Sequence, residues 1–480
     1  MSNILIIIFL IFYFILSKIR LDWAVMLLIV ALPSYLIRFS IFNIPLTLLE
    51  AMILIAFIVW FLKNYKEIIS NLKLKINSKF KVKNLKLKNY PFNKEIILLL
   101  IISFIAIAVA GFTDSAFGIW KAYFFESILV FILIFNVFQN KEKKEINFTK
   151  IFWSIIISAF IVSVFAIYQK ITGNFIFNEL WAEEKTRRVV SFFGYPNAVG
   201  LYLGPIVLIM FGWLIEKIKN LKFIFSKVEV FKIIFISLTI ILSLLSIYFA
   251  KSEGALVGVI AGLIVFGLLS GRKIRLIIIL LVFIFGASTM LYQPTRDYAV
   301  KKIFLKDLSG EIRKQQWKET WKMMTSSKIR FIFGSGLSNY QNAIKPYHQE
   351  GIFFNKENDP DFRRKIVIFN NKYRAEHWQP VEIYMYPHNI FLNFWTELGL
   401  AGLLLFVWII IKFWIIGIKL IKNNNKNNKY LIIGLICSMV VIVIHGLVDV
   451  PYFKNDLSII FWILIAMIGV KKITEECQSG

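Results

Sequence analysis

The sequence predicts an all-α, polytopic integral membrane protein with about 12–13 transmembrane helices and one large extracytoplasmic loop. Hydrophobic residues make up 58% of the chain, which includes 47 phenylalanines, whereas a soluble domain is about half apolar. Apolar runs of roughly 17 to 22 residues recur from end to end, the length that crosses about 30 Å of hydrocarbon. Because each span must satisfy its own backbone hydrogen bonds, these runs are expected to be helices.

The expected spans are separated by connections that alternate in charge. The spans are 3–16, 21–37, 44–62, 95–111, 118–138, 151–171, 196–215, 231–250, 254–270, 274–292, 389–412, 430–449 and 457–470, of which the first two are short enough to form a partial hairpin. The Lys-rich connections 63–94, 140–150, 216–230, 271–275 and 413–429 then all fall on one side. The positive-inside rule makes that side the cytoplasm. The net charge of +27 therefore indicates topology signals and contacts with membrane lipids, and no nucleic-acid partner is expected.

The opposite side carries one connection that is too long for a bare link. Residues 293–388 are rich in Trp, Tyr and Gly turns, and a loop of this length predicts an ordered, partly helical extracytoplasmic domain. The expected organisation is N-terminal transmembrane helices over 1–292, the loop domain over 293–387, and C-terminal transmembrane helices with a short tail over 388–480. The pattern GxxxxGK[ST] is missing from the sequence, so nothing indicates nucleotide-driven pumping.

A histidine stands where the long loop meets an apolar run, in "YPHNIFLNFWTELGLAG" (386–402). Pro387 fits the first turn of a helix, so His388 is expected in that first turn. The positive end of the helix dipole disfavours imidazolium there, and a neutral imidazole can act as a general base. The alternative is an interfacial histidine that hydrogen-bonds a neighbouring loop, and the residue type alone leaves both open.

Two arginines precede an apolar run in "TRRVVSFFGYPNAVG" (186–200). Arg187 and Arg188 lie on the outer side, where the positive-inside rule disfavours them. A guanidinium binds phosphate in a fork and keeps its charge at any working pH. The alternative is that both side chains snorkel to lipid headgroups; the tandem pair next to "YPN" favours anion binding.

A third candidate lies inside the long loop, in "GEIRKQQWKETW" (310–321). At helical spacing Arg313, Trp317 and Trp321 share a face. That face could dock the loop on the membrane helices and point Arg313 into a shared cleft. The alternative is an amphipathic helix that lies on the bilayer with its tryptophans at headgroup depth.

Other ionisable residues lie in or beside the expected spans. His445 and Asp449 have i, i+4 spacing and can touch on one helix face; a polar clamp between helices is favoured over catalysis for this pair. Lys121 and Glu126 are five residues apart, a poor spacing for direct contact.

Taken in order, these stretches resemble the O-antigen ligase-like family of membrane glycosyltransferases, which also covers O-antigen and exopolysaccharide polymerases. The similar motifs are "RRVVSFFGYPNAVGLYL", "IRKQQWKETWKMM…FIFGSGLSNY" and "PHNIFLNFWTELGLAG", and they cover about 186–402. One position departs: where the family often has Ser-Arg-Gly, this chain has "KSEGALVG", with Glu253 in place of the arginine and Lys251 nearby. A third phosphate-binding cation is therefore in doubt here.

The resemblance implies a metal-independent, inverting transfer of a glycan from undecaprenyl diphosphate to an acceptor hydroxyl. The acceptor is lipid A core or a growing polysaccharide, and the sequence does not choose between ligase and polymerase. Arg188 or Arg187, together with Arg313, would grip the diphosphate, and His388 would be the general base. No metal and no cofactor are expected, because the lipid-linked donor already carries the energy. The resemblance also implies the bacterial inner membrane, with the active site facing the periplasm or exterior.

Two readings from other classes remain open. A secondary transporter would use Lys121, Glu126, His445 and Asp449 as a relay and would have paired halves with broken helices. A non-catalytic partner of a polysaccharide exporter would tolerate the loss of His388, whereas the enzyme would not.

Overall fold

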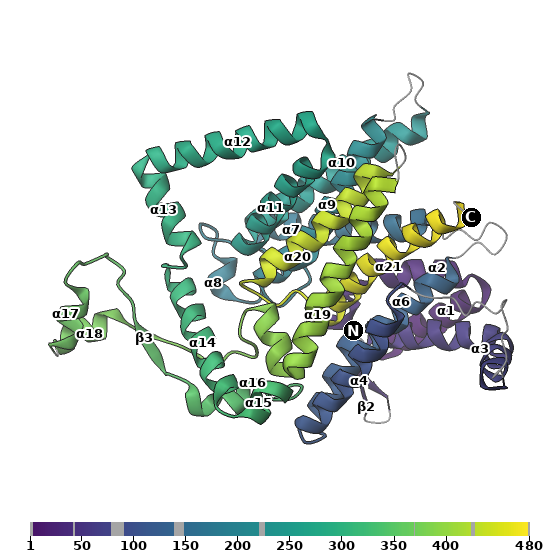
Figure 1. Ribbon diagram of the computed structural model, residues 1–480, viewed down its shortest axis with the longest axis horizontal. Helices are drawn as coiled ribbons and strands as arrows, with labels where there is room; N and C mark the ends of the chain where they lie inside the picture. Colours follow the sequence, from purple (N-terminus) through teal and green to yellow (C-terminus); the bar gives the residue numbers. More distant parts are fainter. Residues whose placement is uncertain are drawn as a thin grey trace.

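Long apolar helices dominate the computed structural model (Figure 1). The structure describes residues 3–41, 44–77, 91–138, 148–219, 226–368, 370–423 and 428–478. Parts of four of the expected Lys-rich connections, 78–90, 139–147, 220–225 and 424–427, lie outside the described residues.

Within those described ranges, nine helical segments are long and apolar enough to cross a membrane. They are α3 (Leu48–Asn77), the continuous run α5–η2–α6 (Asp114–Ile119, Trp120–Phe125, Glu126–Val137), α7 (Phe148–Thr172), α9 (Pro196–Lys219), α10 (Lys227–Phe249), α11 (Glu253–Ser270), α12 (Arg272–Leu291), α19 (Ile390–Asn423) and α20 (Lys429–Gly446). Three shorter apolar helices accompany them, in α1 (Asn3–Ile19), α2 (Leu21–Val30) and the first part of α21 (Asn455–Gln478). The expected all-α polytopic membrane fold is confirmed, and the expected 12–13 spans include these shorter helices.

The remaining elements before residue 292 are short, apart from the apolar helix α4 (Asn93–Val109), which has 17 residues and corresponds to the expected span 95–111. The short elements are η1 (Leu32–Leu36), the antiparallel strands β1 (Arg38–Ile41) and β2 (Ile44–Thr47), and α8 (Glu179–Ala182).

The segment that follows α12 is built mainly of short helices. It contains α13 (Gln293–Ile303), α14 (Leu308–Thr325), α15 (Lys328–Phe333), α16 (Tyr340–Ile344), η3 (Lys345–Tyr347), α17 (Phe362–Val367) and α18 (Asn371–His377), with the antiparallel strands β3 (Gly351–Phe353) and β4 (Trp378–Pro380). Figure 1 shows α17 and α18 at the far end of the β3–β4 ribbon, away from the membrane helices. The longest helix of the segment, α14, lies beside the start of α19 and carries Arg313.

The centre of the bundle is the contact between α9 and α20, which is close because small residues face each other. A Cβ added at Gly434 would lie 2.6 Å from the backbone oxygen of Leu208, and one at Gly212 would lie 2.5 Å from that of Tyr430. Close approach of backbones through glycine is a common way for membrane helices to pack. The α9–α20 contact therefore depends on both glycines.

Replacing Gly434 by valine is expected to destabilise the bundle by about 1–3 kcal/mol, the usual cost of overpacking. The measurement is the thermal unfolding of the detergent-solubilised protein. Gly286→Ala on α12 is the control, because a Cβ there meets nothing within 4 Å. Equal unfolding temperatures for the two variants would contradict this packing.

The two ends of the α9–α20 pair differ in what they hold. At one end the Glu216 carboxylate accepts hydrogen bonds from the backbone N–H groups of Asn428 and Tyr430, at 3.0 and 2.7 Å, so the Lys-rich connections 216–230 and 413–429 meet there. At the other end Asn197 donates a hydrogen bond of 3.4 Å to Asp449. The two ends of the α9–α20 pair therefore differ: the Glu216 contacts lie at one end, and the polar group of Asn197 and Asp449 lies at the other, where the candidate site is found.

The apolar helix α12 makes little contact with the bundle. None of its residues is buried, and Figure 1 shows it running along one side of the molecule, joined to α14 through α13. Such a helix is suited to a hydrocarbon environment, in which its backbone hydrogen bonds are satisfied internally.

The partly exposed Lys121 and the buried Glu126 do not form a direct ion pair. Lys121 pairs with Glu50 on α3, and both carboxylate oxygens of Glu126 are buried with no hydrogen-bond partner among the described residues. The π-helical turn η2 contains Lys121 and ends directly before Glu126. The expectation that their spacing is poor for contact agrees with this arrangement.

Candidate functional site

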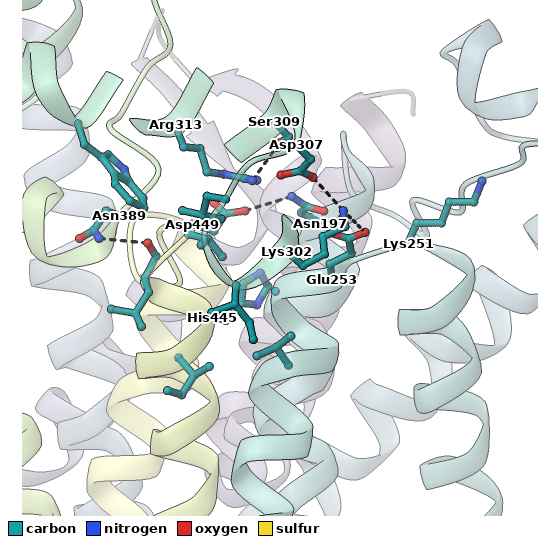
Figure 2. Close-up of a pocket in the computed structure, with 18 of the residues that line it drawn as sticks. Asn197, Lys251, Glu253, Lys302, Asp307, Ser309, Arg313, Asn389, His445 and Asp449 are labelled. Atoms are coloured by element: carbon teal, nitrogen blue, oxygen red, sulfur yellow. Dashed lines mark hydrogen bonds and ion pairs between the residues drawn. The ribbon is translucent and has the colours of Figure 1, made fainter. Parts of the chain in front are cut away.

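A cavity of about 800 Å³ opens at the start of α9 and α11 and the end of α20. Its lining comes from the residues before and at the start of α9, the start of α11, the α13–α14 segment, Asn389, and the end of α20 (Figure 2). Arg188 and Arg313 both line it. The fold therefore brings two of the expected site residues, which are distant in sequence, to one cavity.

Arg188 is fixed by its backbone and by one side-chain bond. Its N–H donates to the Trp181 carbonyl at 2.9 Å, and its Nε donates to the Ala250 carbonyl at 3.1 Å. Burial lowers the pKa of the Arg188 guanidinium, and Glu253 partly offsets that effect. An arginine nonetheless keeps its charge at any working pH, so Arg188 presents a fixed cation to the cavity.

Arg187 has a different place. Its guanidinium donates to the carbonyls of Lys170 at 2.9 Å and Ala182 at 3.2 Å, and it lies against Gly173, where a Cβ would come within 2.7 Å of it. Arg187 does not line the cavity. Of the two neighbouring arginines, Arg188 lines the cavity and Arg187 joins the end of α7 to the segment after α8.

Arg313 projects from the first half of α14. Asp307 caps this helix by accepting from the Gly310 N–H at 3.2 Å. Arg313 Nη1 donates to Ser309 at 2.9 Å, while its Nε is buried with no hydrogen-bond partner among the described residues. A buried donor without a partner is costly, so this guanidinium is suited to bind an anionic ligand. In Figure 2 its side chain reaches toward Asp449.

Helix α14 docks on the membrane helices through its tryptophans. Trp317 Nε1 donates to the Pro387 carbonyl at 2.8 Å, and the Trp321 ring meets Trp395 of α19 edge-on, with centroids 5.5 Å apart. Gln316 adds a bond of 2.8 Å to the Tyr386 carbonyl. These contacts agree with docking and not with a helix that lies free on the bilayer. They also hold the segment directly before His388.

The prediction that His388 lies in the first turn of a helix is wrong. Helix α19 begins at Ile390, and the Asn389 side chain caps it by accepting from the N–H groups of Phe391 and Leu392 at 3.0 and 3.1 Å. His388 precedes this cap with φ of +44°, in the left-handed region. Pro387 therefore ends the loop and does not start the helix, because Asn389 is the stronger N-cap residue.

His388 lies at the edge of the cavity, next to Asp449. Its Nδ1 is 3.9 Å from Asp449 Oδ1, and Asp449 itself is almost fully buried and lines the cavity. His388 is not among the lining residues. A carboxylate that faces one ring nitrogen favours a proton on that nitrogen, which leaves the other nitrogen to accept one.

Asp449 connects the groups of the site. It also accepts from Asn197 at 3.4 Å and from the Val450 N–H at 2.9 Å. Burial by itself would raise the pKa of Asp449, but His388 and His445 beside it lower that pKa to about 2. The i, i+4 pattern of His445 and Asp449 pointed to this carboxylate, but no local signal pointed to His388 as its neighbour.

The depressed pKa of Asp449 predicts how its contribution to stability depends on pH. An ionised Asp449 stabilises the fold above its unfolded value of 3.8, and this stabilisation is lost as the pH falls toward about 2. The difference in unfolding temperature between the wild type and Asp449→Asn is therefore expected to stay constant from about pH 7 to about pH 5 and to shrink below about pH 4. Thermal melts in a pH series measure it, and a difference that grows on acidification would contradict the assignment.

Glu253 takes part in an ion cluster. Lys302 of α13 contacts both Glu253 oxygens at 2.8 and 2.7 Å and Asp307 at 2.8 Å. Lys251 donates to the Thr186 carbonyl at 3.0 Å and extends away from the group in Figure 2. Lys302 was not anticipated, because 49 residues separate it from Glu253. With two carboxylates on one ammonium, this cluster adds no free cation to the cavity.

A family model described as O-antigen ligase matches residues 238–407. The matched stretch runs from α10 into α19 and contains Glu253, Arg313 and His388, while Arg188 and Asp449 lie outside it. No curated protein matches the chain. The match supports an O-antigen ligase-like family, and it agrees with the order of motifs in the sequence. Residues 238–407 are therefore similar to the O-antigen ligase family, which supports an O-antigen ligase-like membrane protein.

Proposed function

We propose that this protein transfers a glycan from undecaprenyl diphosphate to an acceptor hydroxyl on the outer face of the bacterial inner membrane. The acceptor is lipid A core or a growing polysaccharide. The family match supports a membrane glycosyltransferase of the ligase or polymerase type. The observation that carries the finer proposal is that Arg188 and Arg313 line one cavity with Asp449, and that His388 faces Asp449 at its edge.

The two arginines would hold the diphosphate of the donor. As the bond between the anomeric carbon and the diphosphate oxygen breaks, the leaving group takes the electron pair and gains negative charge. Fixed guanidinium groups stabilise that charge without further reorganisation. Arg313 has a buried Nε without a partner in the described structure, so a phosphate oxygen would satisfy a donor that otherwise costs free energy.

His388 would take the proton from the attacking hydroxyl. Its Nδ1 faces Asp449, so Nε2 is the nitrogen that accepts the proton, and Asp449 stabilises the imidazolium that forms. The acceptor oxygen then bonds the anomeric carbon as the diphosphate leaves from the opposite side. A single displacement of this kind inverts the anomeric centre, and no metal or cofactor takes part in the proposed steps.

The alternatives differ in what they require of the same residues. A polymerase of the same family would use the same donor site and differ only in the acceptor. A secondary transporter would use Lys121, Glu126, His445 and Asp449, but Lys121 pairs with Glu50, and His445 and Asp449 line the cavity with the arginines. A non-catalytic export partner would not need His388.

Reconstitution tests the proposal. The purified protein is placed in liposomes with undecaprenyl-diphosphate-linked glycan and two competing acceptors, lipid A core and a second lipid-linked repeat. Transfer to one acceptor is expected, and that choice separates a ligase from a polymerase. The transporter hypothesis replaces this one if a labelled glycan crosses the membrane and neither acceptor is glycosylated, whether or not the donor is consumed.

A further inference from the structure

The His388 side chain remains partly exposed although it does not line the cavity. It is 22% exposed, and His388 is not among the lining residues. Its Nδ1 is buried, so the exposed surface belongs to the rest of the side chain. We take this exposed part as a second approach to His388, apart from the donor cavity.

Aromatic side chains border this second approach. The His388 ring meets Tyr384 and Tyr386 edge-on, with centroids 4.9 and 5.0 Å apart. All three rings are partly exposed. Tyr195 lies beside Tyr386. Burial raises the pKa of Tyr195, and Asp449 and Tyr386 raise it further. The hydroxyl of Tyr195 is buried and interacts with the Tyr386 hydroxyl.

A lysine completes the group. Lys454 Nζ lies 3.8 Å from the centroid of the Tyr195 ring. Burial lowers the pKa of Lys454, and Asp456 and Asp449 partly offset this. The described structure shows no hydrogen bond to its ammonium group, so the three N–H donors of Lys454 are open to a ligand. None of the three residues Tyr195, Tyr386 and Lys454 lines the cavity. None of them takes part in the transfer steps proposed above.

We propose that Tyr195, Tyr386 and Lys454 form an acceptor-side subsite that binds a neutral pyranose and presents its hydroxyl to His388. The proposal rests on the proposed function. The tyrosine rings offer apolar faces for a sugar ring, and the Tyr195 hydroxyl and the Lys454 ammonium offer hydrogen bonds to sugar hydroxyls.

The surrounding charges decide between a neutral and an anionic sugar. Lys454 carries the one positive charge of this group, while Asp449 and Asp456 both act on it. Two carboxylates near one ammonium disfavour a phosphate or a uronic acid at this position, because like charges repel. A neutral hydroxyl-bearing ring meets no such penalty. Donor and acceptor would then approach His388 from different sides, as an in-line displacement needs.

The test separates binding of the acceptor from binding of the donor. Transfer by Lys454→Met and Tyr195→Phe is measured in liposomes with undecaprenyl-diphosphate-linked glycan and with each acceptor in turn, lipid A core and a lipid-linked repeat. The KM for the productive acceptor is expected to rise at least about tenfold in each variant, with the donor KM unchanged. Lys185→Met, an exposed lysine of the outer loop, is the control and is expected to match the wild type.

The outcomes keep the two proposals apart. If the wild type transfers glycan to neither acceptor, the proposed function fails first. If the wild type transfers and the variants keep its acceptor KM, or raise the donor KM instead, the acceptor-side subsite is wrong. Tyr195→Phe retains the ring and its packing, so it remains informative if Lys454→Met fails to fold. A neutral acceptor sugar that competes better than its phosphorylated form would support the assigned ligand class.

Discussion

Replacing His388 by alanine is expected to reduce glycan transfer at least about a hundredfold, the lower end of a general-base contribution. The reason is that the acceptor hydroxyl is a weak nucleophile and loses the group that removes its proton. Donor binding is expected to persist, since Arg188 and Arg313 are unchanged. The measurement is the initial rate of transfer in liposomes at saturating donor and acceptor.

Two controls make the His388 result specific. His388→Gln keeps a hydrogen-bonding side chain of similar length but cannot act as a base at neutral pH, so it should be as impaired as alanine. Thermal unfolding of each variant checks that α14 and α19 remain in place. Transfer at the wild-type rate by either folded variant would show that His388 is not the base.

Arg188→Ala is expected to lower transfer on the order of a hundredfold or more, the range reported for loss of one group that stabilises a developing negative charge. Arg187→Ala is the matched control, because the two arginines are neighbours in sequence and differ in what they contact. Arg187 bonds the carbonyls of Lys170 and Ala182, so its loss should lower the unfolding temperature and affect the transfer rate less.

The same logic applies to Arg313. Arg313→Lys keeps the charge but loses the planar fork and the buried Nε, so it is expected to recover only part of the activity that Arg313→Ala loses. The measurement is kcat and KM for the donor in both variants.

Equal effects of Arg187→Ala and Arg188→Ala on transfer, at equal stability, would contradict the assignment of Arg188 to the cavity.

The membrane fold could be predicted from the sequence because bilayer thickness sets the length of an apolar helix. Runs such as 151–171 and 196–215 predicted α7 and α9 closely. The expected span 389–412 begins within one residue of α19, which starts at Ile390. His388 was nevertheless wrongly placed in the first turn, because Pro387 and Asn389 are both helix-start signals and only the fold shows that Asn389 is the cap. The π-helical turn before Glu126 left no sequence signal that was recognised.

The candidate site was predictable in part. Arg188 and Arg313 carried a signal in their residue type and motif, and the pattern of His445 and Asp449 marked a polar pair. The contact between Asp449 and His388, and that between Lys302 and Glu253, join residues far apart in the chain. Spacing along one helix cannot show such contacts, so only the three-dimensional structure supplies them. The contact of Lys454 with the Tyr195 ring likewise joins residues far apart in the chain.

The account depends on the arrangement of Arg188, Arg313 and His388 around one cavity, and a structure of the protein with a non-transferable undecaprenyl-diphosphate-linked glycan tests it most directly. A map from electron cryomicroscopy should show the diphosphate between the guanidinium groups of Arg188 and Arg313, with the anomeric carbon directed toward His388. Density for the diphosphate elsewhere, with either arginine or His388 out of reach of the donor, would contradict the account.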